Sequence, residues 1–166
     1  LRPMPSESMR RADRLIIEPD ALREVLARCD VLRLGLVDDG CAYIVPMNFG
    51  YDASADPWRL YLHCAAEGRK IRVLRENPVA AFEMDTGHRL VVDDTACRAT
   101  FDYLSLMGEG TVRFLETSDE KRACLDHIMR HMTGRDGWTY EDAILARVTA
   151  LELTVSSISG KRHISG

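Results

Sequence analysis

The sequence YIVPMNFGY at residues 43–51, followed by LYLHCAAEGRKI at residues 60–71, combines two predicted strands with a helix that begins on positive charges. Cations are unfavourable at the positive end of a helix dipole unless an anion compensates them. A guanidinium fork, an ammonium group and the free amides of a first helical turn together suit a phosphate group. The stretch therefore predicts a phosphate site at Gly68, Arg69 and Lys70. The alternative is a solvated helix start.

Composition narrows the classes of partner. The chain has 166 residues, of which 46% are hydrophobic and 29% charged, as expected for one domain with a sizeable core. Its formal charge of −4 lacks the basic excess typical of nucleic-acid binding. Residues 1–18 resemble no signal peptide, and no apolar run is long enough to span a membrane. We therefore expect a cytoplasmic protein that binds neither nucleic acid nor membrane.

The five cysteines are widely spaced and include no Cys-x-x-Cys pair. This spacing argues against a disulfide framework or a zinc ribbon and predicts reduced thiols. Cys64, beside the predicted phosphate loop, is either a reactive thiol or a small buried hydrophobe.

Periodicity and turn residues predict many strands and few helices. Residues 1–8 are expected to be a flexible extension, and residues 9–166 a single domain. Helices are predicted from Pro19 to Cys29, over 67–76, and from the capping box at Thr117 to Gly134. Strands are predicted over 31–37, 42–51, 58–63, 79–84, 88–92, 103–114 and 146–158. Gly108 and Gly110 indicate a bulge or a close approach to the backbone. This pattern favours a small barrel, because closing a sheet removes its exposed edges.

Several segments, in this order, resemble one family. They are MRRADRL at 9–15, the strand at 43–51, LHCAAEGRK at 62–70, SLMGEG at 105–110, IMRHMTG at 128–134 and ISGKRH at 158–163. Together they resemble the pyridoxamine 5'-phosphate oxidase-related proteins of the FMN-binding split-barrel superfamily, and within them the 5-nitroimidazole resistance type of flavoprotein. The resemblance implies a mainly β (α+β) fold, a six-stranded antiparallel split β-barrel with peripheral helices. It also implies a homodimer that binds FMN in grooves shared by both subunits.

The resemblance further implies a role for each matching position. The isoalloxazine ring would lie along Val45, Pro46, Met47, Asn48 and Phe49. The ribityl chain would lie between His63 and Cys64, and the phosphate would be held by Gly68, Arg69 and Lys70. A polar flavin contact is implied at Ser105, and closure over the cofactor at Lys161, Arg162 and His163. Taken without the resemblance, Lys161 to His163 are equally consistent with a solvated tail.

Histidine roles stay open at the level of sequence. His63 is either a structural group or a contact to flavin or substrate, with a general acid role as a hypothesis. Cys124, His127 and His131 have a helical spacing that can mimic a metal site. No clear fourth ligand is near them in the sequence, so structural roles are favoured and no metal is expected.

The function implied is an FMN-dependent oxidoreductase acting on a small planar substrate, with reduction of nitro compounds as the reaction. No dinucleotide-binding pattern is present, so NAD(P)H would bind only transiently over the flavin. The alternatives are a flavin- or haem-binding module without turnover and a pyridoxamine 5'-phosphate oxidase. The latter is disfavoured because Asn48 stands where that enzyme has a lysine, and the C-terminal Arg and Trp pattern is incomplete.

Overall fold

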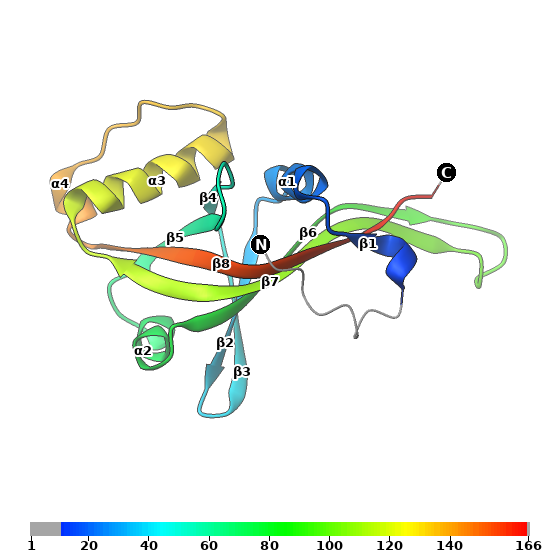
Figure 1. Ribbon diagram of the computed structural model, residues 1–166, viewed down its shortest axis with the longest axis horizontal. Helices are drawn as coiled ribbons and strands as arrows, with labels where there is room; N and C mark the ends of the chain where they lie inside the picture. The colour runs from blue at the N-terminus through cyan, green and yellow to red at the C-terminus, as the bar shows by residue number, and fades with distance from the viewer. Residues whose placement is uncertain (1–10, 166) are drawn as a thin grey trace.

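The computed structural model describes residues 11–165, which form one continuous antiparallel sheet with helices on both sides (Figure 1). The strands are β1 (Leu15–Ile16), β2 (Leu32–Asp38), β3 (Cys41–Met47), β4 (Gly50–Asp52), β5 (Arg59–Ala65), β6 (Val79–Val91), β7 (Thr100–Leu115) and β8 (Val148–His163). The helices are the 3₁₀ turn η2 (Ala12–Arg14) and the α-helices α1 (Pro19–Arg28), α2 (Arg69–Glu76), α3 (Ser118–Thr133) and α4 (Asp142–Leu145). The expected extension at residues 1–8, and the expected start of the fold at Met9, lie outside the described residues.

The sheet confirms the mainly β split-barrel class and differs from the expectation in its strand number. It has eight strands in the order β3-β2-β6-β7-β8-β5-β4, with β1 paired to β8. Six strands were expected; β1 and β4, which are two and three residues long, are among those the sequence pattern did not show separately. The end strands β3 and β4 do not pair with each other, so the sheet stays open.

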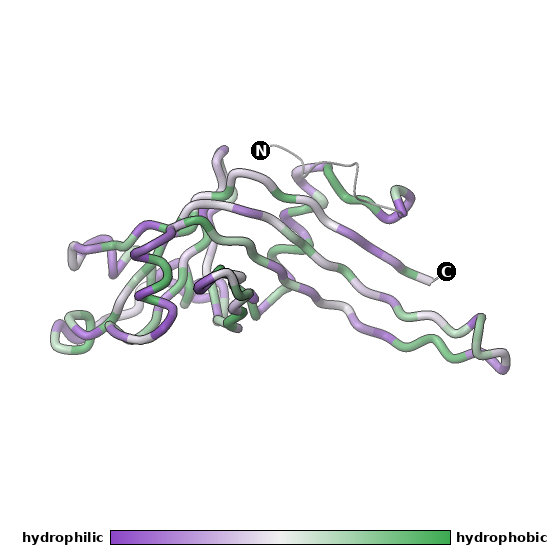
Figure 2. Tube along the Cα trace, turned by 90° about the horizontal axis from the view of Figure 1, so that it is seen from below, coloured by the Kyte–Doolittle hydropathy of each residue, from purple (hydrophilic) through white to green (hydrophobic). Residues whose placement is uncertain are grey.

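The largest departures from the predicted strand bounds occur at three places, whereas the other strands shift by three residues or fewer. The predicted strand 42–51 is interrupted at residues 48–49, because the chain leaves its partner β2 and pairs again with β5 as β4. The two strands predicted over 79–92 are one strand, β6, with a register shift between Thr86 and Arg89. The polar residues 159–163 continue β8, because backbone hydrogen bonding to β7 does not require apolar side chains. β6, β7 and the end of β8 form an elongated arm (Figures 1 and 2).

Both glycines that predicted close backbone approach show it. A Cβ atom on Gly108 would lie 2.3 Å from the Phe82 ring, and one on Gly110 would lie 2.3 Å from the carbonyl oxygen of Thr154. The register of β7 against β8 shifts between Glu109 and Gly110, so the bulge is confirmed.

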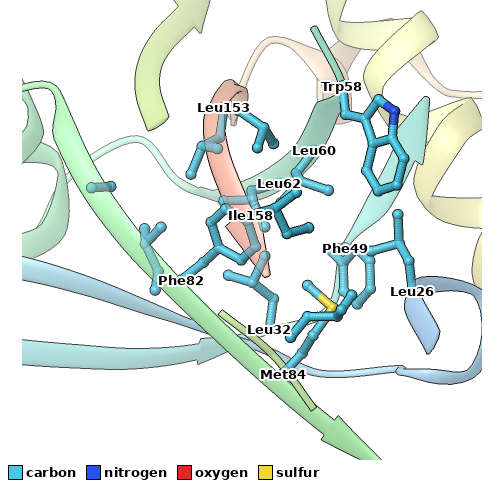
Figure 3. Packing of buried hydrophobic residues seen from close by; sticks show 14 of the residues in the cluster. Leu26, Leu32, Phe49, Trp58, Leu60, Leu62, Phe82, Met84, Leu153 and Ile158 are labelled. Carbon is cyan, nitrogen blue, oxygen red and sulfur yellow. The ribbon is translucent and has the colours of Figure 1, made fainter. Parts of the chain in front are cut away.

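The core fills the space enclosed by the curved sheet and α1 (Figure 3). Trp58, Leu60 and Leu62 on one side and Phe82 and Met84 on the other are at most 3% exposed. Each fully buried side chain of this size contributes about 1.5–3 kcal/mol through removal of apolar surface from water.

Helix α3 begins and ends as its sequence predicts. The hydroxyl of Thr117 accepts a hydrogen bond from the Glu120 amide at 3.2 Å, and the Glu120 carboxylate accepts one from the Thr117 amide at 3.1 Å. Gly134 ends the helix with a φ of 68°. No helix within residues 11–165 is long and apolar enough to cross a bilayer.

Candidate functional site

Helix α2 starts without a side-chain cap. Gly68 precedes it with a φ of 130°, and a Cβ atom at this position would meet no atom within 4 Å. The first amides of a helix have no partner within the helix, and Gly68, the N-cap residue of α2, has no side chain that could accept a hydrogen bond from them. A surface hollow of about 440 Å³ lies on one side of α2, and its lining includes the carboxylates of Glu67 and Glu76 but neither Arg69 nor Lys70. The uncapped first turn of α2, rather than this hollow, fits an anion.

Arg69 and Lys70 differ in their surroundings. Arg69 donates through Nε to an Asp38 carboxylate oxygen at 2.6 Å, and its guanidinium carbon lies 4.2 Å from the centre of the Tyr43 ring. Lys70 Nζ contacts Met47 Sδ at 3.3 Å, and in the described part of the chain no carboxylate lies within ion-pair distance of it. The sequence argument that only a bound anion could compensate cations here is therefore incomplete, since Asp38 compensates Arg69 from within the chain.

Asp38 and Arg72 are the members of this site that the sequence analysis missed. Arg72 donates to both carboxylate oxygens of Asp38, at 2.8 and 2.9 Å. The hydrogen bond from Arg69 Nε, together with those from Arg72, holds the pKa of Asp38 below its usual value. A signal was present in the sequence, because strand alternation places Asp38 on the inward face of β2 with Leu34 and Leu36. A carboxylate at an inward position requires a partner.

The residues expected along the flavin ring alternate between exposed and buried. Pro46 is exposed on β3, an end strand of the sheet, as its missing amide donor predicts. Asn48 donates to the carbonyl oxygen of Asp30 at 3.0 Å. Val45 is half-buried and packs against the core, and Met47 is buried beside Lys70.

Phe49 lies inside the core rather than along a ligand surface. It is 0% exposed, and its ring centre lies 4.7 Å from that of His131. A ring in this position presents no surface to a ligand in this conformation. The sequence pattern did not show that Phe49 is buried while its neighbours reach the surface, because the chain turns inward at residues 48–49.

His63 and Cys64 lie at the end of β5, paired in register with Ala150 and Thr149 of β8. The pKa of His63 lies below its usual value because of restricted hydration and the nearby charge of Lys70. At neutral pH His63 is therefore an uncharged hydrogen-bonding group. Burial raises the pKa of the Cys64 thiol, which keeps it protonated and favours its interpretation as a small hydrophobe.

Ser105, Lys161 and His163 form a second group at the other end of the sheet. Ser105 pairs with Lys161 across β7 and β8, and His163 Nε2 lies 2.8 Å from the Thr100 hydroxyl. Ala150, the partner of His63, is on the same strand as Lys161, and at about 3.3 Å per residue the two lie roughly 35 Å apart. Figure 1 shows α2 and the C-terminal end of β8 at opposite ends of the molecule. Within one chain the structure does not bring these two groups together.

The histidines and the cysteine of α3 have structural contacts. Cys124 is fully buried, and its thiol lies 3.4 Å from the carbonyl oxygen of Leu62. The His127 ring stacks on Tyr61 at 4.2 Å, and His131 Nε2 lies 2.7 Å from the carbonyl oxygen of Cys29.

An apolar outer face covers part of β2, β3, β6 and β7. Its exposed side chains include Val37, Ile44, Val79 and Met107, of which Ile44 is 65% exposed. A groove of about 390 Å³ crosses this outer face along Gly35, Ile44, Ala81 and Met107. Exposed apolar surface gathered on one face is typical of an interaction site.

The open antiparallel sheet, with a cationic helix start beside its end strand, defines a split-barrel protein. The chain belongs to the pyridoxamine 5'-phosphate oxidase family, whose sequence profile matches residues 18–162. The resemblance derived from the sequence is thereby confirmed. None of the curated proteins matches the chain.

Solved structures share this fold over most of the chain. A proposed 5-nitroimidazole antibiotic resistance protein from Bacteroides thetaiotaomicron is 35% identical, over 89% of this chain and 86% of its own, with a TM-score of 0.78. The FAD and heme binding protein from Mycobacterium smegmatis is 22% identical, over 92% of this chain and 74% of its own, with a TM-score of 0.77. The flavocytochrome Anf3 from Azotobacter vinelandii is 16% identical, over 95% of this chain and 72% of its own, with a TM-score of 0.78. At these lower identities, the last two show the fold alone.

Proposed function

We propose that the protein is a flavin-dependent oxidoreductase that binds FMN with the phosphate at the start of α2. The observation that carries this proposal is the group of hydrogen-bond donors at the start of α2. The terminal nitrogens of Arg69 make no hydrogen bond within residues 11–165, Lys70 lacks a carboxylate partner, and the first turn of α2 is uncapped. This set matches the acceptor oxygens of a phosphate group.

The flavin would supply the electron transfer, and the protein would position it and tune its reduction potential. His63, at the end of β5 and near the charge of Lys70, would hydrogen-bond the cofactor or the substrate as a neutral imidazole. A general acid role for His63 requires turnover to fall in His63→Ala while FMN stays bound. Unchanged turnover with bound FMN would exclude that role.

Each flavin site would combine residues from two copies of the chain. Ser105, Lys161 and His163 lie too far from α2 to reach the same flavin within one chain. A second copy covering the apolar outer face would exclude that face from water and could bring the two groups together. Ile44→Glu places a charge on this face, and it should convert a dimer to a monomer in light scattering. A wild-type protein that is monomeric at all concentrations would contradict the shared site.

The proposed substrate class is supported by the solved relative at 35% identity, which is described as a proposed 5-nitroimidazole antibiotic resistance protein. This similarity supports a small planar nitro-heteroaromatic compound stacked on the exposed flavin face, reduced by electrons from a transiently bound NAD(P)H. The test is anaerobic mixing of the FMN-loaded protein with NAD(P)H and then with a nitroimidazole. Reduced flavin that no nitroaromatic compound reoxidises would contradict the proposed activity.

The cofactor proposal is tested by mass spectrometry of the ligand released from purified protein, followed by titration with FMN. The double variant Arg69→Glu and Lys70→Glu should lose FMN affinity. Arg75→Glu, an exposed charge change on the same helix, should retain it. Equal FMN affinity in the wild type and the double variant would overturn the assignment. A released haem would favour a haem-binding module instead.

A further inference from the structure

Asp38 is an inward-facing carboxylate at the end of β2 that no part of the function proposed above uses. Its side chain is 9% exposed, and it lies between two arginines of α2. Arg69 approaches it through Nε alone, at 2.6 Å, whereas Arg72 donates to both oxygens. Arg72 therefore fixes the carboxylate, and the carboxylate in turn fixes Arg69.

The guanidinium of Arg69 is restrained on its edge and on its face. Asp38 occupies the Nε edge, and the Tyr43 ring lies 4.2 Å from the guanidinium carbon. Arg69 is 51% exposed, so without these contacts its side chain would sample many rotamers. Fixing a rotamer-rich side chain before the ligand arrives removes part of the ordering cost from binding.

The charges of this cluster suit a phosphomonoester. Arg69, Lys70 and Arg72 carry three positive charges and Asp38 one negative charge, which leaves two positive charges. A phosphomonoester carries about −1.5 to −2 at neutral pH. Since Arg72 compensates the carboxylate with two hydrogen bonds, the charge of Arg69 remains available to the ligand.

We propose that Asp38 is a positioning residue that holds Arg69 ready for the phosphate group of the flavin. This inference rests on the proposed FMN site and adds to it a residue that does not touch the ligand. The opposite possibility is that Asp38 competes with the phosphate for Arg69. The two possibilities predict opposite changes in FMN affinity when the carboxylate is removed.

The test compares Asp38→Asn with Asp39→Asn, which removes the same charge from the same turn. Asp39 has a φ of 51°, a conformation that asparagine tolerates, and it forms no ion pair in the described part of the chain. Flavin fluorescence quenching gives the Kd for FMN and for riboflavin, which lacks the phosphate. Asp38→Asn should weaken FMN binding about tenfold relative to Asp39→Asn. Loss of a residue that hydrogen-bonds a metal ligand from behind typically weakens metal binding about 10- to 100-fold, and the expected effect here takes the lower end of that range. Riboflavin affinity should be equal in the two variants.

An FMN affinity in Asp38→Asn that equals or exceeds that of Asp39→Asn would overturn the positioning role and leave the FMN site standing. A wild-type protein that binds FMN no more tightly than riboflavin would overturn the phosphate site itself, and the role of Asp38 with it. If circular dichroism shows that Asp38→Asn is unfolded, Arg72→Gln replaces it, with Arg75→Gln as its control. The expected result is again a selective loss of FMN affinity in Arg72→Gln, and equal affinities in the two variants would overturn the proposal.

Discussion

Replacing Leu62 by Ala tests whether this side chain of β5 belongs to the hydrophobic core. Leu62 is 0% exposed and lies among Leu60, Trp58 and Ile158 (Figure 3). Removing a buried leucine side chain to Cβ costs the lost transfer free energy plus a cavity term, about 2–5 kcal/mol in total. For a chain of this length, a loss of about 3 kcal/mol lowers Tm by roughly 6–12 °C.

The matched control is Leu90→Ala, which removes the same atoms from a side chain that is 62% exposed on the arm. Its unfolding free energy should change by no more than about 0.5 kcal/mol. Urea unfolding of both variants at one protein concentration measures the two costs directly. Equal costs, or a cost below about 1 kcal/mol for Leu62→Ala, would refute the assignment of these side chains to core and surface.

Further predictions follow from single contacts. Gly50→Ala should lower the free energy of unfolding by about 2 kcal/mol or more in urea, because its Cβ atom would lie 2.3 Å from backbone atoms of α3; an unchanged midpoint would contradict this packing. Thr117→Ala should lower the free energy of unfolding by about 1 kcal/mol through loss of the capping box; a variant as stable as the wild type would show the cap to be dispensable. NMR titration should place the pKa of His63 below 6.5 and move it upward in Lys70→Met. Since the unfolded state binds this proton more readily, His63 should make stability fall as pH drops below about 6.5. Asp102 has a pKa lowered to about 2 by hydrogen bonds to Ser165, so Asp102→Asn should speed amide exchange at the C-terminal residues; unchanged exchange would refute that anchor.

Local pattern was sufficient for most of the secondary structure. The capping box at Thr117, the αL terminator Gly134 and the proline at the start of α1 each act within a few residues of chain, so sequence alone predicted them. Gly108 and Gly110 also signalled close packing correctly, although not the identity of the neighbouring atoms. The order of several motifs along the chain predicted the family, which the profile match confirms.

Only the tertiary structure decided which of the candidate residues share a site. Asp38 lies 31 residues before Arg69, and their ion pair exists because β2 and α2 pack together. The burial of Phe49, and the separation of Lys161 from the start of α2, likewise depend on where the chain turns and how long β8 runs. Side-chain chemistry and short-range periodicity can be read along the chain. Long-range contacts depend on strand register and on how elements pack, which no single segment specifies.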